Sequence, residues 1–464
     1  MSGYKFTKAP KSVRLVHTRN RRIKTKIPVP ASIAILKELE RVESRSMHGQ
    51  LPVVWNRAKD YKVFDRYGNC WIDFTSTIFV TNSGHANPKI VSALKKALDQ
   101  DLLHSYTFAN ESRVKFLRKL IAITPRQFQK AFLLSSGTEA TECALKLARL
   151  YGQTIRPSKR VIISFKGSMH GRTMGAEMLK GDPASSAWIG HRDPHIYHLQ
   201  IPYPWTMSDG ESGKPDWGKR FTRDIKALQK RGLKPKNIAG FFIESYVGWA
   251  AYFYPKDYIK ALNNFAKKNK SLLIFDDIQG GFGRSGKLFA YQHYGVKPDI
   301  LCIGKALSGS LPLSAVLGSR GIMDLPGVGS MSSTHSANPL CCTAGLANLE
   351  VIEEGDLVGE SARKGNILRA RLAELKERFS NRIAYYFSNG LIAAIIFKDP
   401  VTGKPDVDFS NRVCEKAMQK GLLLVHTGRE SVKIGPPLTI PDSALIEGLD
   451  VFEEAILEAD KTRR

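Results

Sequence analysis

Apolar residues occur along the chain in short uninterrupted runs, bounded by glycine, serine or acidic residues. The clearest run, at 272–275, leads directly into Asp276 and Asp277. An apolar run without alternation is typical of a strand covered on both faces, as in a parallel sheet. We therefore expect this strand to deliver its carboxylates to the edge of a buried sheet, and a buried carboxylate calls for a cationic partner.

Similar runs begin at Phe132, Val161, Ile238 and Asp299, and the first of them is followed by helical spacing. Strands that alternate with helices predict an α/β fold with a mostly parallel sheet. Other segments read as a lobe of mixed composition: a helix at 30–46, short strands near 53–55, 61–65 and 70–74, strands at 383–387 and 391–397, and a final helix from Asp442. Residues 181–220 have no clear periodicity and are expected to form a loop over a crevice.

Lys305 lies 29 positions after Asp276 (305 − 276), just past the apolar run that begins at Asp299. The interval has room for a crossover at 289–295, so both side chains are expected at the carboxyl ends of neighbouring parallel strands. Open α/β sheets bind ligands there. A buried lysine with a lowered pKa is a good Schiff-base nucleophile, and a carboxylate opposite it suits a protonated ring nitrogen.

The block DDIQGGFGRSGKLFAYQHYGVKPDILCIGKALSGSLPLSAVLG, which begins at Asp276, resembles the matching block of the class III, pyridoxal-phosphate-dependent aminotransferases, such as the 4-aminobutyrate and ornithine enzymes. The resemblance covers roughly residues 50 to 460, with five blocks in family order. It implies a seven-stranded, aspartate-aminotransferase-like large domain at 76–334. It also implies an N-terminal arm and part of a small domain at 1–75, and a C-terminal small α+β domain at 335–464.

The resemblance also implies roles around pyridoxal 5'-phosphate. Lys305 would form the Schiff base and then act as general base and acid, while Asp276 would keep the ring nitrogen protonated. The other implied cofactor-binding residues are Gly137 and Thr138 at the phosphate, Met169 over the ring in place of an aromatic residue, Glu244, Gln279 at the phenolic oxygen, and Thr334 at the phosphate of a partner subunit. The amides of Gly137 and Thr138 also read as an anion site at a helix N-terminus, with a plain helix cap as the alternative.

Five positions correspond to substrate-binding residues of the family. Ile78 and Phe79 match a pocket wall, with plain core packing as the alternative, and Arg172 matches an arginine that contacts a substrate carboxylate. Trp249 and Lys433 stand where related enzymes carry a glutamate and an arginine that pair as a gate. Because both halves differ here, the resemblance does not say how an α-carboxylate is held, although Lys433 offers a point charge.

The chain has 70 Lys and Arg against 43 Asp and Glu, a net charge of +27, and its first 37 residues hold ten of those basic residues. This excess favours anionic substrates or partners, including an acidic carrier protein that presents the substrate. Six scattered cysteines show no metal spacing, so no metal is expected and a reducing cytoplasm fits. We find no signal peptide or membrane-spanning run in the sequence.

Three functions are weighed. The first is an aminotransferase that moves an amino group from an amino acid or terminal amine to a keto acid such as 2-oxoglutarate or pyruvate, in a homodimer with shared sites. The second is an aminomutase or amino-acid epimerase of the same family, in which the same lysine returns the proton elsewhere. The third, a non-catalytic or nucleic-acid-binding protein, is disfavoured because no nucleic-acid motif and no basic stripe interleaved with aromatic residues is found.

Overall fold

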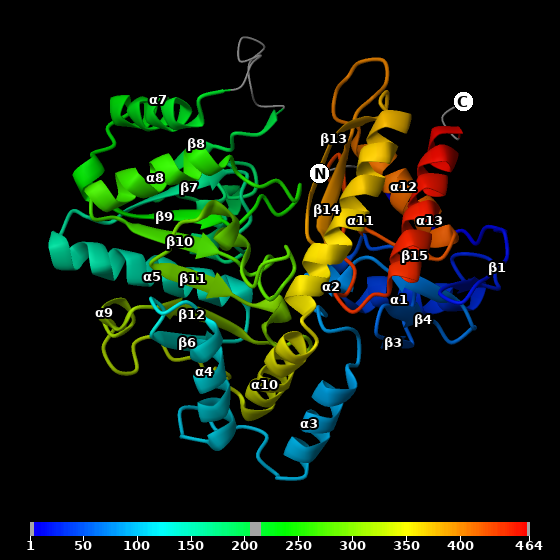
Figure 1. Cartoon of the computed structure of the whole chain (residues 1–464), viewed down its shortest axis with the longest axis horizontal. Helices are drawn as coiled ribbons and strands as arrows, with labels where there is room; N and C mark the ends of the chain where they lie inside the picture. The colour runs from blue at the N-terminus through cyan, green and yellow to red at the C-terminus, as the bar shows by residue number, and fades with distance from the viewer. Residues whose placement is uncertain (1–3, 205–214, 462–464) are drawn as a thin grey trace.

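The centre of the molecule is a seven-stranded sheet, seen in a computed structural model that describes residues 4–204 and 215–461 (Figure 1). In spatial order the strands are β6 (Lys130–Leu134), β12 (Ser314–Gly318), β11 (Ile300–Ile303), β10 (Leu272–Asp276), β9 (Ile238–Glu244), β7 (Val161–Lys166) and β8 (Ile196–Gln200). Only β12 runs antiparallel to its neighbours. The mostly parallel α/β fold that the sequence predicts is confirmed.

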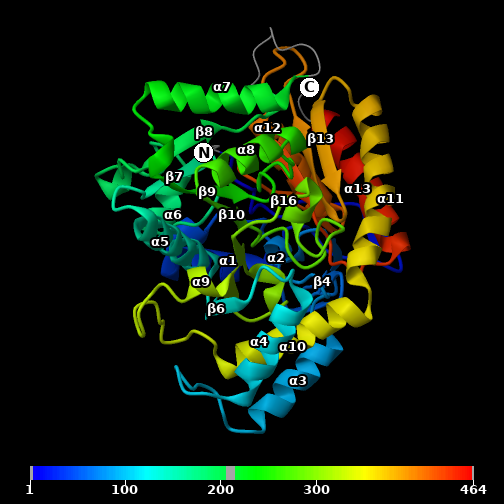
Figure 2. The same cartoon turned by 60° about the vertical axis from the view of Figure 1, so that its left-hand side comes forward.

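Alternate residues of each central strand pack on opposite faces of this sheet. In β10, Leu273 and Phe275 join the core beneath α7 (Trp217–Lys230) and α8 (Lys256–Lys268). Leu272 and Ile274 instead join the core beneath α5 (Gly137–Ile155). Figure 2 shows α7 and α8 together on one side of the sheet and α5 on the other. Since both faces are covered, the strands carry apolar residues without alternation.

A second region, on the right of Figure 1, is formed by segments from both ends of the chain. One antiparallel sheet contains β13 (Ile383–Asn389), β14 (Ile392–Phe397), β17 (Ser431–Ile434) and β16 (Val425–His426). A second sheet contains β1 (Val16–His17), β2 (Arg22–Ile23), β5 (Cys70–Asp73), β4 (Lys62–Phe64) and β3 (Arg57–Lys59) in antiparallel pairs, with β15 (Leu422–Leu423) paired in parallel to β5. The pairing of β15 with β5 joins the two ends of the chain.

The remaining helices pack around these sheets. They are α1 (Ile33–Val42), α2 (Ser76–Phe79), α3 (Pro88–Leu98), α4 (Glu111–Ile123), α6 (Met174–Leu179), α9 (Arg320–Met323), α10 (Pro339–Glu354), α11 (Leu357–Arg378), α12 (Val407–Gln419) and α13 (Asp442–Lys461). Short 3-10 helices lie at η1 (Pro30–Ser32), η2 (Arg45–Met47), η3 (Ala187–Ile189), η6 (Pro235–Asn237), η7 (Ala290–Tyr294) and η8 (Lys305–Leu307). In the described part of the chain, no helix combines the length and the apolar character needed to cross a bilayer.

Two expectations about strands are wrong. The strand expected at 53–55 lies instead at β3, where a tight turn at Asp60, with φ of 53°, pairs Lys59 with Lys62. The region 181–220, expected as a loop, contains the edge strand β8 and the start of α7, while residues 205–214 lie outside the described residues. β8 forms by pairing with β7, a contact that periodicity within the segment does not reveal.

Candidate active site

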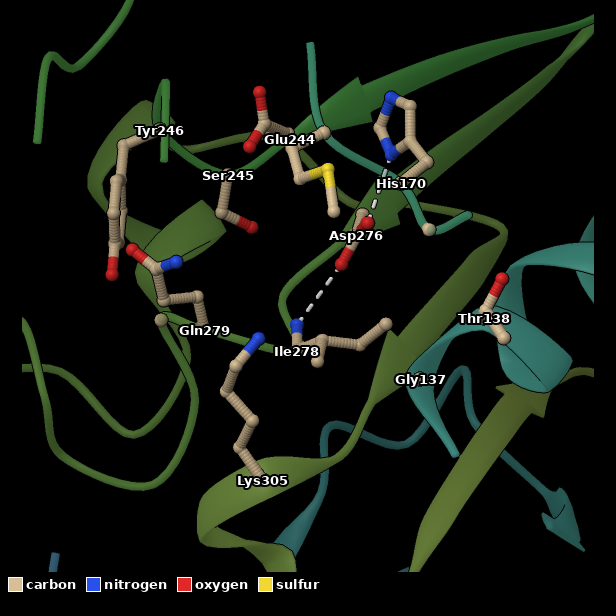
Figure 3. Close-up of a pocket in the computed structure, with 13 residues that line it drawn as sticks. Gly137, Thr138, His170, Glu244, Ser245, Tyr246, Asp276, Ile278, Gln279 and Lys305 are labelled. Carbon is tan, nitrogen blue, oxygen red and sulfur yellow. Dashed lines mark hydrogen bonds and ion pairs between the residues drawn. The ribbon is translucent and has the colours of Figure 1, made fainter. Parts of the chain in front are cut away.

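A cavity of about 270 Å³ lies where the parallel strands of the large sheet end (Figure 3). Its walls come from the ends of β9 and β10, the start of α5, the loop after β7 and the start of η8, just past β11. The lining residues are Gly137, Thr138, Met169, His170, Gly171, Glu244, Ser245, Tyr246, Asp276, Ile278, Gln279, Gly280 and Lys305. Parallel strands bring their carboxyl ends to one edge, so residues distant in sequence meet there.

Asp276 is the last residue of β10, and both of its carboxylate oxygens are held. The ring Nδ1 of His170 donates to Oδ2 at 2.8 Å, and the backbone N–H of Ile278 donates to Oδ1 at 3.1 Å, as the dashed lines of Figure 3 show. The carboxylate is therefore oriented before any ligand enters. An oriented, buried carboxylate is suited to hold a cationic nitrogen of a ligand.

Lys305 follows β11, and its side chain points into the same cavity (Figure 3). Burial lowers the pKa of its amine, while Asp276 and Glu244 act in the opposite direction. A larger share of unprotonated amine makes this lysine a better nucleophile and base. Its backbone has a φ of 46°, a left-handed conformation that is rare outside glycine and often marks functional positions.

The N-terminus of α5 faces the cavity through Gly137 and Thr138. A capping box orders this turn: the Ser136 hydroxyl accepts from the N–H of Glu139, whose carboxylate accepts from the N–H of Ser136. A Cβ on Gly137 would lie 3.1 Å from Ile278, so the close approach favours glycine. Exposed amides and the helix dipole make this turn a site for a phosphate or other anion.

Glu244 and Gln279 form the opposite wall. Glu244 accepts from the N–H of Gly248 at 3.0 Å through Oε1, and its Oε2 is buried without a hydrogen-bond partner among the described residues. Burial raises the pKa of Glu244 to about 7. Gln279 accepts through Oε1 from Nζ of Lys433, which is buried on β17. Lys433 therefore reaches the edge of the cavity through Gln279 and is not itself a lining residue.

A turn of four consecutive left-handed residues lies beside this wall. The segment is α2 (Ser76–Phe79), and its φ angles run from 44° to 68°. Arg284, fully buried, donates to the hydroxyl of Ser76 at 3.2 Å and to the carbonyl of Leu391 at 3.0 Å. Because left-handed conformations are costly for residues other than glycine, the turn depends on such surroundings.

The structure brings some expected substrate residues near the cavity and not others. Met169 lines it and remains 43% exposed, whereas Phe79 is buried under Lys433, with Nζ 4.2 Å from the ring centre. Ile78 is 45% exposed in the left-handed turn. Arg172 follows the lining residue Gly171, and its side chain is exposed to solvent.

Trp249 and Thr334 are not among the lining residues of this cavity. The Trp249 indole packs edge to face with Tyr203 at 5.1 Å, and the Arg429 guanidinium lies 3.7 Å from the indole ring. Thr334 is exposed, and its carbonyl accepts from a ring nitrogen of His104 at 2.8 Å. Within one chain, neither side chain reaches the cavity.

Six other lining residues were not among the expected site residues: His170, Gly171, Ser245, Tyr246, Ile278 and Gly280. His170 and Ile278 stand beside expected residues in their motifs, so adjacency in the sequence was the available signal. Ser245 and Tyr246 reach the cavity because β9 ends at Glu244 beside Asp276, a register that only the folded sheet shows.

The residues present fit pyridoxal phosphate. A buried amine of lowered pKa, an oriented carboxylate, an anion-binding helix terminus and a glutamine line one cavity, with Ile278 between the carboxylate and the helix turn. Lys305 matches the aldehyde, Asp276 the pyridine nitrogen, and the turn at Gly137 and Thr138 the phosphate. In residues 4–204 and 215–461, no cluster of three or more metal-ligating side chains is found.

Comparisons with known proteins agree with this site. A family model for class-III aminotransferases matches residues 44–456. A 4-aminobutyrate aminotransferase of Mycobacterium leprae is 30% identical over 449 residues, covering 94% of this chain and 98% of the relative. A leucine/methionine racemase of Thermococcus litoralis is 34% identical over 421 residues, covering 89% of this chain and 92% of the relative.

Among solved structures, an acetylornithine aminotransferase from Elizabethkingia anophelis is similar, with a TM-score of 0.76 and 30% identity, covering 92% of this chain and 99% of that chain. Membership of one family therefore explains both the shared fold and the residues around Lys305 and Asp276. This chain belongs to the class-III aminotransferase family and is a pyridoxal-phosphate-dependent transaminase.

Proposed function

We propose that this transaminase moves an amino group from an amino acid or a terminal amine to a keto acid such as 2-oxoglutarate or pyruvate, with Lys305 as the covalent anchor of the cofactor. The single observation that carries the proposal is that Lys305 and the oriented carboxylate of Asp276 line one buried cavity. When bound, pyridoxal phosphate supplies an electron-accepting ring that stabilises negative charge at the substrate carbon.

The residues of the chain then divide the work. Nζ of Lys305, whose pKa is lowered by burial, takes the proton from the substrate carbon that bears the amine. Asp276, fixed by His170, holds a proton on the pyridine nitrogen. Gly137 and Thr138 bind phosphate through the start of α5, Gln279 donates to the phenolic oxygen, and Met169 and Glu244 border the ring.

Substrate contacts are assigned more narrowly. Ile78 is proposed to face the substrate, because it projects from the left-handed turn with 45% exposure, and Phe79 to support that wall from below. Arg172 is proposed to meet a distal carboxylate, because its exposed guanidinium follows the lining residue Gly171. Trp249 and Lys433 are proposed to occupy the two gate positions near the substrate. Because they replace the glutamate and the arginine of related enzymes, the acid–arginine pair does not form here.

We also propose a homodimer with shared sites. Thr334 is exposed and lies outside the cavity of its own chain, so it is available to the phosphate of a partner's cofactor. Apolar side chains that one chain leaves exposed include Val328, on the segment that leads to Thr334, and Leu103 and Phe108, on the segment of His104, which contacts Thr334. Such side chains are typical of a surface that another subunit covers.

Racemisation is the second candidate, because a relative of 34% identity is named a leucine/methionine racemase. Racemisation would also begin with removal of the proton by Lys305, but a proton would then return to the other face of the same substrate carbon. The two functions differ in products: transamination releases a keto acid and leaves the cofactor as its amine, whereas racemisation retains every atom of the amino acid. Analysis of the products of a single turnover separates them.

An acidic carrier protein is a further proposed partner. Its support is a basic surface over α7 and α8, where the exposed basic residues are Lys219, Arg223, Lys226, Lys230, Arg231, Lys234, Lys236, Lys256, Lys260, Lys267, Lys268 and Lys270. Turnover of a carrier-bound amine that is unchanged when Lys226 and Lys230 become glutamates would count against this partner.

All six cysteines are free, which supports the proposed location in a reducing cytoplasm.

The decisive experiment is Lys305→Ala, compared with wild type after addition of pyridoxal phosphate. Wild type should gain a visible absorption band that amino donors bleach, with keto acid formed in equal amount. Lys305→Ala should bind the cofactor without that band and lose at least about three orders of magnitude in kcat, as expected for a covalent anchor that is also the base. Full turnover in Lys305→Ala, or a wild type that stays colourless, would refute the proposed function.

A further inference from the structure

Lys433 is enclosed by protein, in a position where its relatives' motif has an arginine. It sits in the middle of β17, paired with Ala394 of β14 and Val425 of β16. Its side chain is 3% exposed. Nζ donates to Oε1 of Gln279 at 2.5 Å and lies 4.2 Å from the centre of the Phe79 ring. The amine is thus held between an amide oxygen and an aromatic face.

The charges around Lys433 make it a poor permanent cation. Burial lowers its pKa well below the ordinary value, and the positive charges of Lys305 and Arg284 lower it further. Glu244 is the group that favours the charged form. A glutamate at position 249 would add an opposing charge, but Trp249 stands there and packs against Tyr203. The amine therefore lacks the acid that the gate of related enzymes supplies.

The contact with Lys433 also decides how the Gln279 amide faces the cavity. An amide carries an acceptor oxygen on one side and a donor NH₂ on the other. Because Nζ of Lys433 donates to Oε1, the NH₂ group is left for the opposite side. Figure 3 shows the nitrogen of Gln279 on the side of Ser245 and Lys305 and the oxygen on the side of Tyr246.

We propose that Lys433 is a positioning residue: it fixes the Gln279 amide with its N–H groups toward the cavity, where they donate to the phenolic oxygen of bound pyridoxal phosphate. This inference rests on the proposed function, because it needs the cofactor in this cavity. It gives Lys433 a task other than gripping the substrate's α-carboxylate. An enzyme with this arrangement should depend on Lys433 even with amine substrates that carry no α-carboxylate.

The test is a pH titration of the visible absorption of protein loaded with pyridoxal phosphate. A donor at the phenolic oxygen stabilises its negative charge and so weakens proton binding at the neighbouring nitrogen. Lys433→Met removes the fixed donor, so the titration midpoint should rise by about 0.5 to 1 pH unit, the equivalent of one hydrogen bond of about 1 kcal/mol. Gln279→Leu should raise it by at least as much.

The double variant Lys433→Met/Gln279→Leu distinguishes a positioning role of Lys433 from a direct effect of its charge. If Lys433 acts through Gln279, the double variant should titrate like Gln279→Leu alone, because the second change has nothing left to disturb. If Lys433 acts by its own charge beside Lys305, Glu244 and Arg284, its shift should recur in the Gln279→Leu background, and the proposal would be overturned. An unchanged midpoint in Lys433→Met would also overturn it.

Two controls complete the design. Lys159→Met removes another buried lysine, which donates to the carbonyls of Ile238 and Asn269, and should leave the midpoint unchanged. Lys433→Arg keeps a hydrogen-bond donor, so its titration midpoint should lie within a few tenths of a pH unit of wild type. A midpoint like that of Gln279→Leu would contradict the proposal. This variant also tests the proposal if Lys433→Met does not fold. A wild type that never colours would refute the proposed function, whereas a coloured wild type with an unshifted Lys433→Met refutes only this inference.

Discussion

The pKa of the Glu244 carboxylate is set by burial without a full set of hydrogen-bond partners. Its Oε2 has no hydrogen-bond partner among the described residues, and burial raises its pKa to about 7 from an ordinary value of 4.5. The folded chain therefore keeps the proton on Glu244 over a pH range in which the unfolded chain has lost it. Stability falls with rising pH wherever the folded state binds more protons.

Glu244→Gln should remove this pH dependence. As the pH rises from 4.5 to 7, the unfolding free energy of the wild-type apoprotein should fall by up to about 3 kcal/mol because of Glu244. The Glu244→Gln variant should not show this fall. Urea unfolding of both apoproteins at pH 5 and pH 8 measures it, with the exposed Glu377→Gln as control. A difference between Glu244→Gln and wild type that is the same at both pH values would show that Glu244 is ionised in the folded protein.

One element of the fold has a strained backbone conformation that its own sequence does not predict. The left-handed turn α2 (Ser76–Phe79) includes Thr77 at φ of 51°. A β-branched residue is particularly disfavoured in this conformation. Arg284, Asn82 and the carbonyl of Pro436 form one buried hydrogen-bonded network beside the turn, and this network offsets its cost.

Thr77→Gly should stabilise the protein. Thr77 is exposed, so little packing is lost, and glycine adopts the left-handed conformation without strain. We expect the unfolding free energy to rise by about 0.5 to 1 kcal/mol, seen as a higher urea midpoint with an unchanged slope. The matched control is Thr154→Gly on α5, where φ is helical and glycine should cost a few tenths of a kcal/mol. Equal effects at both positions would contradict the strain argument.

At the scale of the whole molecule, the proposed dimer makes one chain insufficient for one site. Lys305 lines the cavity of its own chain, whereas Thr334 lies outside it. If Thr334 serves the partner's cofactor, two different inactive variants can repair each other. Lys305→Ala lacks the anchor, and Thr334→Asp places a negative charge against phosphate.

Co-refolding these two variants in equal amounts should restore about one quarter of the wild-type activity. Half of the dimers are then mixed, and one of the two sites in each mixed dimer has both groups intact. Each variant refolded alone should stay inactive. No recovery in the mixture, with mixed dimers verified by mass or by affinity tags, would show that each site is built from one chain.

Much of the fold and of the central chemistry could be read from local patterns. The apolar runs predicted β10 and β9, because a strand covered on both faces needs apolar residues at every position. Asp276 and Lys305 were found because each follows such a run, whereas Gln279 was implied only by the resemblance to the family. The domain boundaries at 75 and 334 stay a prediction, as do the roles assigned to single site residues.

What the sequence alone determined about this protein is the mostly parallel sheet, the family and the placement of Lys305 and Asp276 at one edge of that sheet, since all three follow from residue order along single strands and turns. The tertiary structure decided that His170 holds Asp276, that Trp249 turns away to Tyr203 and that Lys433 meets Gln279. It also decided the left-handed turn at Thr77 and the edge strand β8. These features depend on contacts between segments far apart in the chain, and no local pattern encodes such contacts.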